Sequence, residues 1–342
     1  MALWGLLPAT TPVHVALVIA ATAVVWVASD GLESSADRLS AHYGLPAVIQ
    51  GSVVVAVGSS FPELSSVIVT SIKGVFDMGV GAIVGSAIFN VLVIPAVAGI
   101  VTDEPVDANR PLVFKEAQFY MLAVAAMAIT FALAVIYEPA AGTLVGTITR
   151  PIAALPLLLY LLYLFIQYQD VSDHDAGERP DDVRVGYQWA VLAGSLIVIL
   201  VAVHQLVEGV DGLSQTFGVP EFLAGVTIIA AATSVPDTFV SVRAARAGNG
   251  LTSIGNVLGS NTFDLLVAIP IGVLIVGEVT INFGVAVPML GVLTAATVAL
   301  FVSLRTDLEL SDREAYMLLG IYMVFFTWVV TETIGLTHVL PR

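Results

Sequence analysis

Two stretches of the chain repeat each other: VGSSFPELSS at residues 57–66 and AATSVPDTFV at residues 231–240. A second matching pair follows them, GAIVGSAIFNVLV at 81–93 and GNVLGSNTFDLLV at 255–267. Both pairs align without a gap at one offset, 231 minus 57, or 174 residues. An internal repeat of this kind predicts a duplicated architecture in which each copy contributes one half.

The composition around these motifs is that of a polytopic membrane protein. Of 342 residues, 58% are hydrophobic and only 11% are charged, whereas soluble domains are about 25% charged. Cysteine is absent, which excludes disulfides and thiolate metal sites. Apolar runs long enough to cross a bilayer recur without the alternation of a β-barrel. We therefore predict an all-α polytopic membrane protein with ten transmembrane helices, near Val13–Ser29, Pro46–Ile72, Met78–Val101, Ala117–Ile136, Pro151–Ile166, Gln188–Val207, Glu221–Arg246, Leu251–Val276, Ile281–Leu304 and Glu314–Val330.

The repeat offset spans five of these helices. Because five is odd, the second copy must enter the membrane upside down, which is the inverted-topology repeat of secondary transporters. We expect residues 1–167 to form the first five-helix repeat, with its motif at 56–93, and residues 188–342 to form the second, with its motif at 230–267. Residues 168–187 are expected to form an acidic cytoplasmic linker.

Basic residues indicate the orientation. With both termini outside, nine of the twelve Lys and Arg residues fall on the cytoplasmic side, and only Lys73, Arg150 and Arg342 fall outside, as the positive-inside rule requires. The net charge of −15 suits a host with a very salty interior, where charge repulsion is screened. We expect an integral protein of the plasma membrane of a halophilic prokaryote.

Three carboxylates fall well inside predicted spans: Glu63, Asp237 and Asp264. A charge in hydrocarbon costs about 3 kcal/mol or more, so each such residue is a functional hypothesis. All three lie in the repeated motifs, where Asn90 is the repeat partner of Asp264, and no span has a central Lys or Arg. A bound cation or a proton must therefore balance their charge.

The neighbouring residues favour a metal cation. Ser59 precedes Glu63 by four residues and therefore shares its helix face, and Thr233 stands in the same relation to Asp237. Hydroxyl, amide and carboxylate oxygens suit hard cations, and Ca²⁺ and Na⁺ release their water more readily than Mg²⁺. Pro62 and Pro236 each remove a backbone donor, so we expect interrupted helices with carbonyls open to an ion.

These motifs resemble the paired repeats of the calcium/cation antiporter superfamily, specifically its sodium/calcium exchanger branch. The resemblance lies in GSSFPEL with GSAIFN and in ATSVPDT with GSNTFD. Asp237 and Asp264 are more similar to the residues of the potassium-dependent exchangers. The resemblance implies exchange of Na⁺ for Ca²⁺, with K⁺ or H⁺ open as a further ion and no cofactor. The cation ligands that it implies are Ala56, Ser59, Ser60, Glu63, Ser86, Asn90, Ala230, Thr233, Ser234, Asp237, Ser260 and Asp264.

Other functions are alternatives to this one. A Ca²⁺/H⁺ exchanger on the same scaffold is the main alternative, and a passive cation channel is another. An intramembrane aspartyl protease needs two carboxylates about 3 Å apart that share a proton. The repeated hydroxyls have no role in that chemistry, so no enzyme is expected. The expected partners are cations and lipid, not nucleic acid, and the oligomeric state stays open. Spans one and six lack central polar residues and are expected to be the pair that slides during alternating access.

Overall fold

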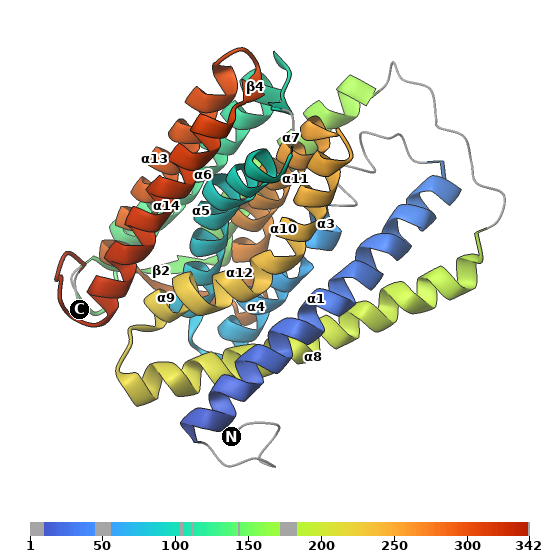
Figure 1. Cartoon of the computed structure of the whole chain (residues 1–342). Helices are drawn as coiled ribbons and strands as arrows, with labels where there is room; N and C mark the ends of the chain where they lie inside the picture. The colour runs from blue at the N-terminus through green and yellow to red at the C-terminus, as the bar shows by residue number, and fades with distance from the viewer. Residues whose placement is uncertain are drawn as a thin grey trace.

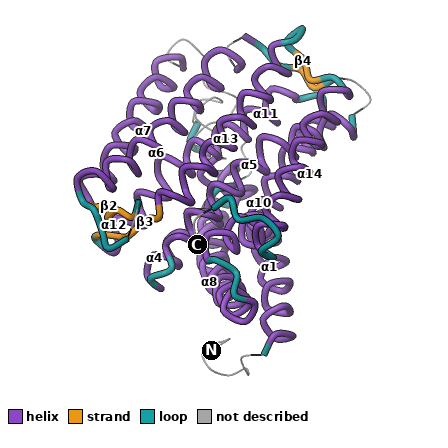
Figure 2. Tube along the Cα trace, turned by 90° about the vertical axis from the view of Figure 1, so that its left-hand side faces the viewer, coloured by secondary structure: helices purple, strands orange, loops and turns teal. Residues whose placement is uncertain are grey.

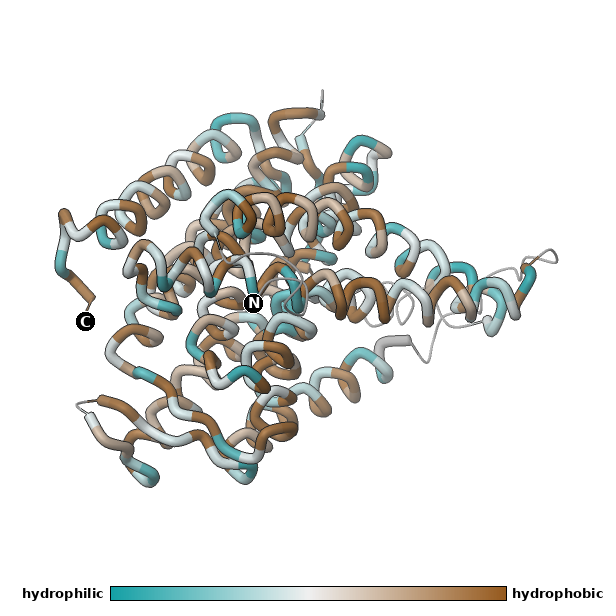
Figure 3. The backbone as a smooth tube through the Cα atoms, turned by 90° about the horizontal axis from the view of Figure 1, so that it is seen from below, coloured by the Kyte–Doolittle hydropathy of each residue, from teal (hydrophilic) through white to brown (hydrophobic). Residues whose placement is uncertain are grey.

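The computed structural model describes residues 10–44, 56–102, 105–110, 112–142, 144–171 and 183–340. Within these ranges nine helices are long and apolar enough to cross a membrane, and each overlaps one predicted span. The remaining span, Pro46–Ile72, is represented by α3 (Ala56–Ser59) and α4 (Phe61–Lys73), and its residues 46–55 lie outside the described ranges. Hydrophobic residues recur along the helices throughout the bundle (Figure 3). The chain is a polytopic α-helical membrane protein.

The elements follow one another in two similar series (Figure 1). Around α3 and α4, the first series contains α1 (Thr11–His42), α5 (Phe76–Val101), β1 (Val106–Asp107), η3 (Leu112–Glu116), α6 (Ala117–Tyr137), β2 (Val145–Thr149) and α7 (Arg150–Val171). The second contains α8 (Val185–Phe217), α9 (Glu221–Ala224), η4 (Gly225–Ile229), α10 (Ala230–Arg246), α11 (Gly250–Phe263), η5 (Asp264–Ala268), α12 (Ile269–Val276), β3 (Glu278–Asn282), α13 (Phe283–Arg305), β4 (Glu309–Leu310) and α14 (Asp312–Thr333). The three η elements are π-helical turns.

Several predicted boundaries were wrong. The sixth span was expected to end at Val207, but α8 runs on to Phe217. The first span was expected to end at Ser29, but α1 runs on to His42 and packs along α8 (Figure 1), so its polar second half is helix and not loop. The linker was expected at residues 168–187, but α7 continues through Val171 and α8 begins at Val185. Residues 172–182 lie outside the described ranges.

Helix boundaries follow the sequence repeat. Adding 174 to the bounds of α1, 11 and 42, gives 185 and 216, and α8 spans Val185–Phe217. The turns after these helices also match, since Gly44 and Gly218 both have φ of 66°. Positive φ is a conformation that glycine adopts without a steric penalty, so the repeat preserves backbone geometry as well as sequence.

Short strands tie the two series together in a reciprocal way. β1 pairs with β4, and β2 pairs with β3, both antiparallel. Because β1 and β3 occupy corresponding places, as do β2 and β4, the two pairings exchange under the repeat. They lie at opposite ends of the bundle in both views (Figures 1 and 2), an arrangement that agrees with the expected inversion.

Basic residues gather near the β1–β4 pair. Arg110 and Lys115 follow β1, Arg305 and Arg313 flank β4, and Arg246 lines a cavity beside β1. All five were assigned to the cytoplasmic side, so the structure groups them at one end as that assignment requires.

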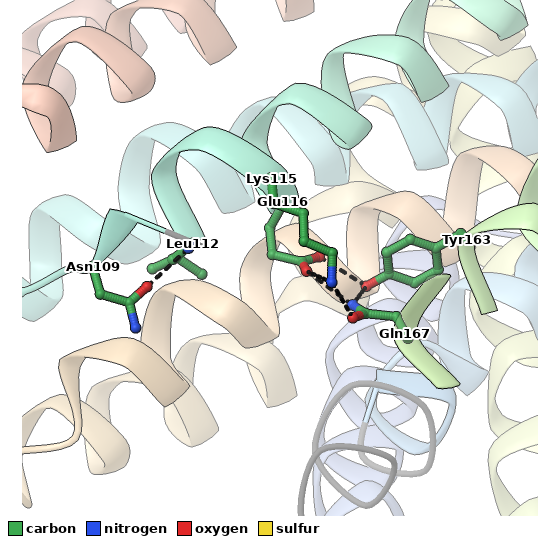
Figure 4. A network of polar contacts seen from close by, with 6 residues as sticks. All are labelled: Asn109, Leu112, Lys115, Glu116, Tyr163 and Gln167. Carbon is green, nitrogen blue, oxygen red and sulfur yellow. Dashed lines mark hydrogen bonds and ion pairs between the residues drawn. The ribbon is translucent and has the colours of Figure 1, made fainter. Parts of the chain in front are cut away.

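A polar network near this end fixes η3 against α7 (Figure 4). The Lys115 ammonium donates to Gln167 Oε1 at 2.9 Å, and Gln167 Nε2 donates to Glu116 Oε1 at 2.9 Å. The Tyr163 hydroxyl donates to Glu116 Oε2 at 3.1 Å. The polar side chains of this network thus have hydrogen-bond partners close to the helix end. Without partners, their partial burial would cost free energy.

The two repeats approach closely where α5 packs against α9 and η4. A Cβ on Gly81 would lie 2.2 Å from the Phe222 carbonyl oxygen, and one on Gly85 would lie 2.4 Å from that of Val226. Conversely, a Cβ on Gly225 would lie 2.1 Å from the Met78 carbonyl oxygen. Small residues that allow backbone contact are the usual basis of helix packing in membranes, so these glycines set the distance between the repeats.

Replacement of one of these glycines should destabilise the bundle. Gly85→Ala forces the backbone of α5 away from Val226, and we expect a loss of about 1–3 kcal/mol, the usual cost of overpacking. The free energy of unfolding of the purified protein in detergent measures this loss. Gly291→Ala is the matched control, because nothing lies within 4 Å of a Cβ at Gly291; equal stability of both variants would contradict the close approach.

Candidate cation site

The predicted site residues converge between the repeats, from α3 and α4, α5, α10, α11 and the start of η5. The Ala56 side chain lies outside the described part of the chain. The other eleven residues are all buried, with 1% or less of their surface exposed: Ser59, Ser60, Glu63, Ser86, Asn90, Ala230, Thr233, Ser234, Asp237, Ser260 and Asp264.

Hydrogen bonds join the two motifs across the site. Ser59 Oγ and Ser260 Oγ are 3.0 Å apart, and Ser86 Oγ and Ser234 Oγ are 2.8 Å apart. Asn90 Nδ2 donates to Asp237 Oδ2 at 3.0 Å. Every one of these contacts links a residue of the first repeat to a residue of the second, so neither half forms the site alone.

Hydroxyls of one repeat lie beside carboxylates of the other. Ser59 is next to Asp237, and Thr233, the repeat partner of Ser59, is next to Glu63. Ser60 is likewise next to Asp264. The three carboxylates also interact electrostatically with one another, which makes simultaneous ionisation unfavourable unless a cation intervenes.

Several buried oxygens of the site have no hydrogen-bond donor. They are both carboxylate oxygens of Glu63, both of Asp264, Oδ1 of Asp237 and Oδ1 of Asn90. An unsatisfied buried acceptor costs about 1–3 kcal/mol, and more if charged. Oxygens from both repeats that lack donors are what a hard cation coordinates, so the residues present fit a Ca²⁺ or Na⁺ cargo.

The coordination must be mixed. Among the described residues no three carboxylate or imidazole groups lie close enough together to hold one metal ion. An ion bound here would therefore need further oxygens, which the serine and threonine hydroxyls and the Asn90 amide offer. This arrangement favours adjacent sites that share ligands over one site formed by three carboxylates.

The two prolines act differently. In the first motif the helix is interrupted as predicted, because α3 ends at Ser59 and α4 begins at Phe61, with Pro62 in its first turn. In the second motif the prediction was wrong: α10 continues from Ala230 to Arg246 through Pro236. A proline lacks the N–H that would bond to the carbonyl four residues earlier, so Ala232 keeps an open carbonyl without a break in the helix.

Thr233 bonds to its own helix. Its hydroxyl donates to the carbonyl oxygens of Ile229 at 3.2 Å and Ala230 at 3.5 Å. A hydroxyl that donates in this way retains two lone pairs. Thr233 can therefore accept a cation beside Glu63 while its proton stays on the backbone.

Asn261 belongs to the site and was missed. It is fully buried, its Oδ1 accepts a hydrogen bond from Asn90 Nδ2 at 3.0 Å, and its Nδ2 donates to the Ala87 carbonyl oxygen at 3.2 Å and the Tyr120 hydroxyl at 3.3 Å. Asn261 thus holds the Asn90 amide with its Oδ1 available for an ion. An asparagine in the middle of an apolar helix can itself indicate a functional site. Its repeat partner is Ala87, so a comparison of the polar residues that the two copies share does not find it.

Removal of this support should weaken cation binding. In Asn261→Ala the Asn90 amide loses one fixed acceptor, worth about 1 kcal/mol, and we expect the Kd for Ca²⁺ to rise roughly five- to tenfold. Calorimetric titration of the purified protein with Ca²⁺ measures the change. Asn249→Ala is the control, since Asn249 is exposed and makes no capping hydrogen bond; wild-type affinity in Asn261→Ala would refute the positioning role.

Comparison with known proteins agrees with this geometry. The family described as sodium/calcium exchanger protein matches residues 13–169 and 187–331. The inner membrane protein YrbG of Escherichia coli is 28% identical over 272 residues, 77% of this chain and 81% of that protein. The sodium/calcium exchanger MaX1 of Methanosarcina acetivorans is 24% identical over 332 residues, 87% of this chain and 93% of that protein.

The fold is also that of a solved exchanger. A structure of the sodium-calcium exchanger NCX_Mj superimposes with a TM-score of 0.65 at 20% sequence identity, covering 93% of this chain and 99% of that one. The match to the family extends over both repeats and includes both motifs. The chain therefore belongs to the sodium/calcium exchanger family, and it is an integral membrane antiporter of Ca²⁺ and other cations, not an enzyme.

Proposed function

We propose that this protein exchanges Na⁺ for Ca²⁺ by alternating access, with both ions bound among the residues of the two motifs. The observation that supports this most directly is the set of buried oxygens without donors on Glu63, Asn90, Asp237 and Asp264. A site that served protons alone would need the carboxylates but not the hydroxyls beside each of them. The hydroxyls provide neutral oxygens, which a Na⁺ ion needs to replace its water.

The charges suit competition between the two cations. Three Na⁺ ions balance Glu63, Asp237 and Asp264, and so does one Ca²⁺ with one K⁺ or one proton. An empty site leaves three buried carboxylates uncompensated, which is strongly unfavourable. The protein therefore changes conformation readily only when loaded, and this couples the two fluxes instead of permitting a leak.

The α1–α8 pair contacts the rest of the bundle through an apolar surface, along which sliding requires little free energy. Its inner face is a separate apolar cluster, with Val25 and Leu32 of α1 and Val203 and Leu206 of α8 packed against residues of α4, α5, η4 and α10. Apolar contacts are non-directional, so one packing arrangement can replace another. We propose that this pair slides across the core of the bundle and exposes the site to each side in turn.

The coupling is testable in liposomes. Vesicles that contain the purified protein and internal Na⁺ should accumulate ⁴⁵Ca²⁺ when diluted into Na⁺-free medium, because the outward Na⁺ gradient drives Ca²⁺ inward. Collapse of the gradient with a Na⁺ ionophore should stop uptake. Uptake that ignores the Na⁺ gradient but follows an imposed pH gradient would instead identify a Ca²⁺/H⁺ exchanger, and addition of K⁺ to either side tests co-transport.

Neutralisation of the carboxylates should abolish this flux. Glu63→Gln and Asp237→Asn each remove a charge that the bound cations balance, and we expect Ca²⁺ uptake at background level. Both variants should remain folded, since an amide is less costly to bury than a carboxylate. Asp312→Asn, at an exposed position in the first turn of α14, removes the same charge far from the site and should transport normally. Full activity in either site variant would contradict the assignment.

A further inference from the structure

A cavity of about 190 Å³ lies between α1 and α10, directly beside the site. Its lining includes two carboxylates of α1, Asp30 and Glu33, together with Trp26, Pro236, Phe239 and Arg243. Pro236 precedes Asp237 in the chain, so the cavity reaches the backbone that carries a site carboxylate. Glu33 lies beyond Val13–Ser29, the predicted first span, in the part of α1 that was expected to be outside the helix.

Glu33 lies against both motifs. Its Cγ would be 3.9 Å from a Cβ built on Gly58, which adjoins Ser59 in the first motif. Its carboxylate also interacts electrostatically with Asp237 of the second motif. Oε1 of Glu33 is buried and has no hydrogen-bond partner, as is Oδ1 of Asp237. The buried oxygens without hydrogen-bond donors therefore include one on α1 as well as those of the central site.

The basic residue of the cavity forms its ion pair with Asp30, although it also interacts electrostatically with Glu33. Arg243 Nη1 pairs with Asp30 Oδ1 at 3.3 Å, and both side chains are largely exposed. Next to this ion pair Trp26 stacks on Phe239, with ring centroids 4.6 Å apart. These two contacts join α1 to α10 at the outer side of the cavity and leave Glu33 on its inner side, towards Asp237.

We propose that Glu33 is a fourth carboxylate of the cation pathway, which holds a cation in the cavity between α1 and α10, one step away from Asp237. This inference rests on the proposed antiport function and adds a residue to it. Offset by 174, Glu33 corresponds to Val207, so α8 offers no equivalent carboxylate. The outer binding position therefore exists on one side only, and it moves with α1 when α1 slides.

The test compares charge with shape at position 33. In reconstituted vesicles Glu33→Gln should reduce kcat/KM for Ca²⁺ about tenfold, mainly through KM, because a charged cleft raises the local concentration of counter-ions by at least that factor. Glu33→Asp should retain most of the wild-type value, and Asp312→Asn should equal wild type. The difference in kcat/KM between wild type and Glu33→Gln should become smaller when the concentration of N-methylglucamine chloride is raised. The reason is that the Debye length falls from about 10 Å at 0.1 M to about 3 Å at 1 M.

Two outcomes overturn the proposal: wild-type kcat/KM in Glu33→Gln, or an equal loss in Glu33→Asp and Glu33→Gln, which would indicate packing alone. Failure of the broader function is distinguishable, because then wild type itself shows no uptake driven by Na⁺. In that case the same variants are compared under whichever gradient drives Ca²⁺.

A second readout does not depend on transport. The chain contains no cysteine, so Glu33→Cys introduces a single thiol. A membrane-impermeant cationic methanethiosulfonate should modify this thiol rapidly from one side of oriented vesicles, because the cavity admits water and cations. Val203→Cys, at a fully buried position of the α1–α8 interface, should not react. A thiol that stays unmodified in the Glu33→Cys variant would show that no aqueous route reaches this position and would overturn the proposal.

Discussion

The constraint on which the structure depends is the burial of Glu63, Asp237 and Asp264 in one place with no described Lys or Arg paired to them. Burial of uncompensated charge costs several kilocalories per mole for each group. Neighbouring hydroxyls offset part of this cost, and in the proposed function the bound cations offset the rest. The contacts between the halves, such as Ser59 with Ser260 and Ser86 with Ser234, hold the oxygens in position for an ion that each half alone binds incompletely.

The sequence repeat determines the arrangement of the helices, and the positions at which the two copies differ determine the chemistry of the site. Corresponding positions hold Asn90 and Asp264, so one side of the site carries an amide and the other a carboxylate. Asp264 also begins a π-helical turn, whereas Asn90 lies in regular α-helix; π-helical turns are frequent at functional sites. A fully symmetric site would carry four identical charges, which the proposed three Na⁺ ions could not balance.

Much of this was accessible from the sequence, for identifiable reasons. Ten apolar runs predicted the helices, nine of which match long helices in the described part of the chain, and the gapless repeat predicted twelve site residues, of which the eleven with described side chains converge. The failures have physical causes too. The length of α1 was underestimated because Asp30 and Glu33 resemble a helix end in the sequence, whereas in the structure α1 continues past them and packs along α8. Asn261 was missed because its partner is Ala87, and the continuous helix at Pro236 depends on packing that no local pattern encodes.

The same geometry limits how the site can open. Asp30 of α1 pairs with Arg243 of α10, and Lys73 of α4 pairs with Glu208 of α8; since α4 corresponds to α10 and α8 to α1, the two ion pairs are counterparts at opposite ends of the bundle. The proposed slide of the α1–α8 pair would strain both at once. The exposed Asp30–Arg243 pair contributes only about 1 kcal/mol or less, whereas the Lys73 and Glu208 side chains are only 22% and 19% exposed. The Asp30–Arg243 pair can therefore hold one resting arrangement without blocking the proposed movement. In the proposed mechanism the larger barrier is the unbalanced charge of the empty site, so the cargo, more than the ion pairs, controls the transition.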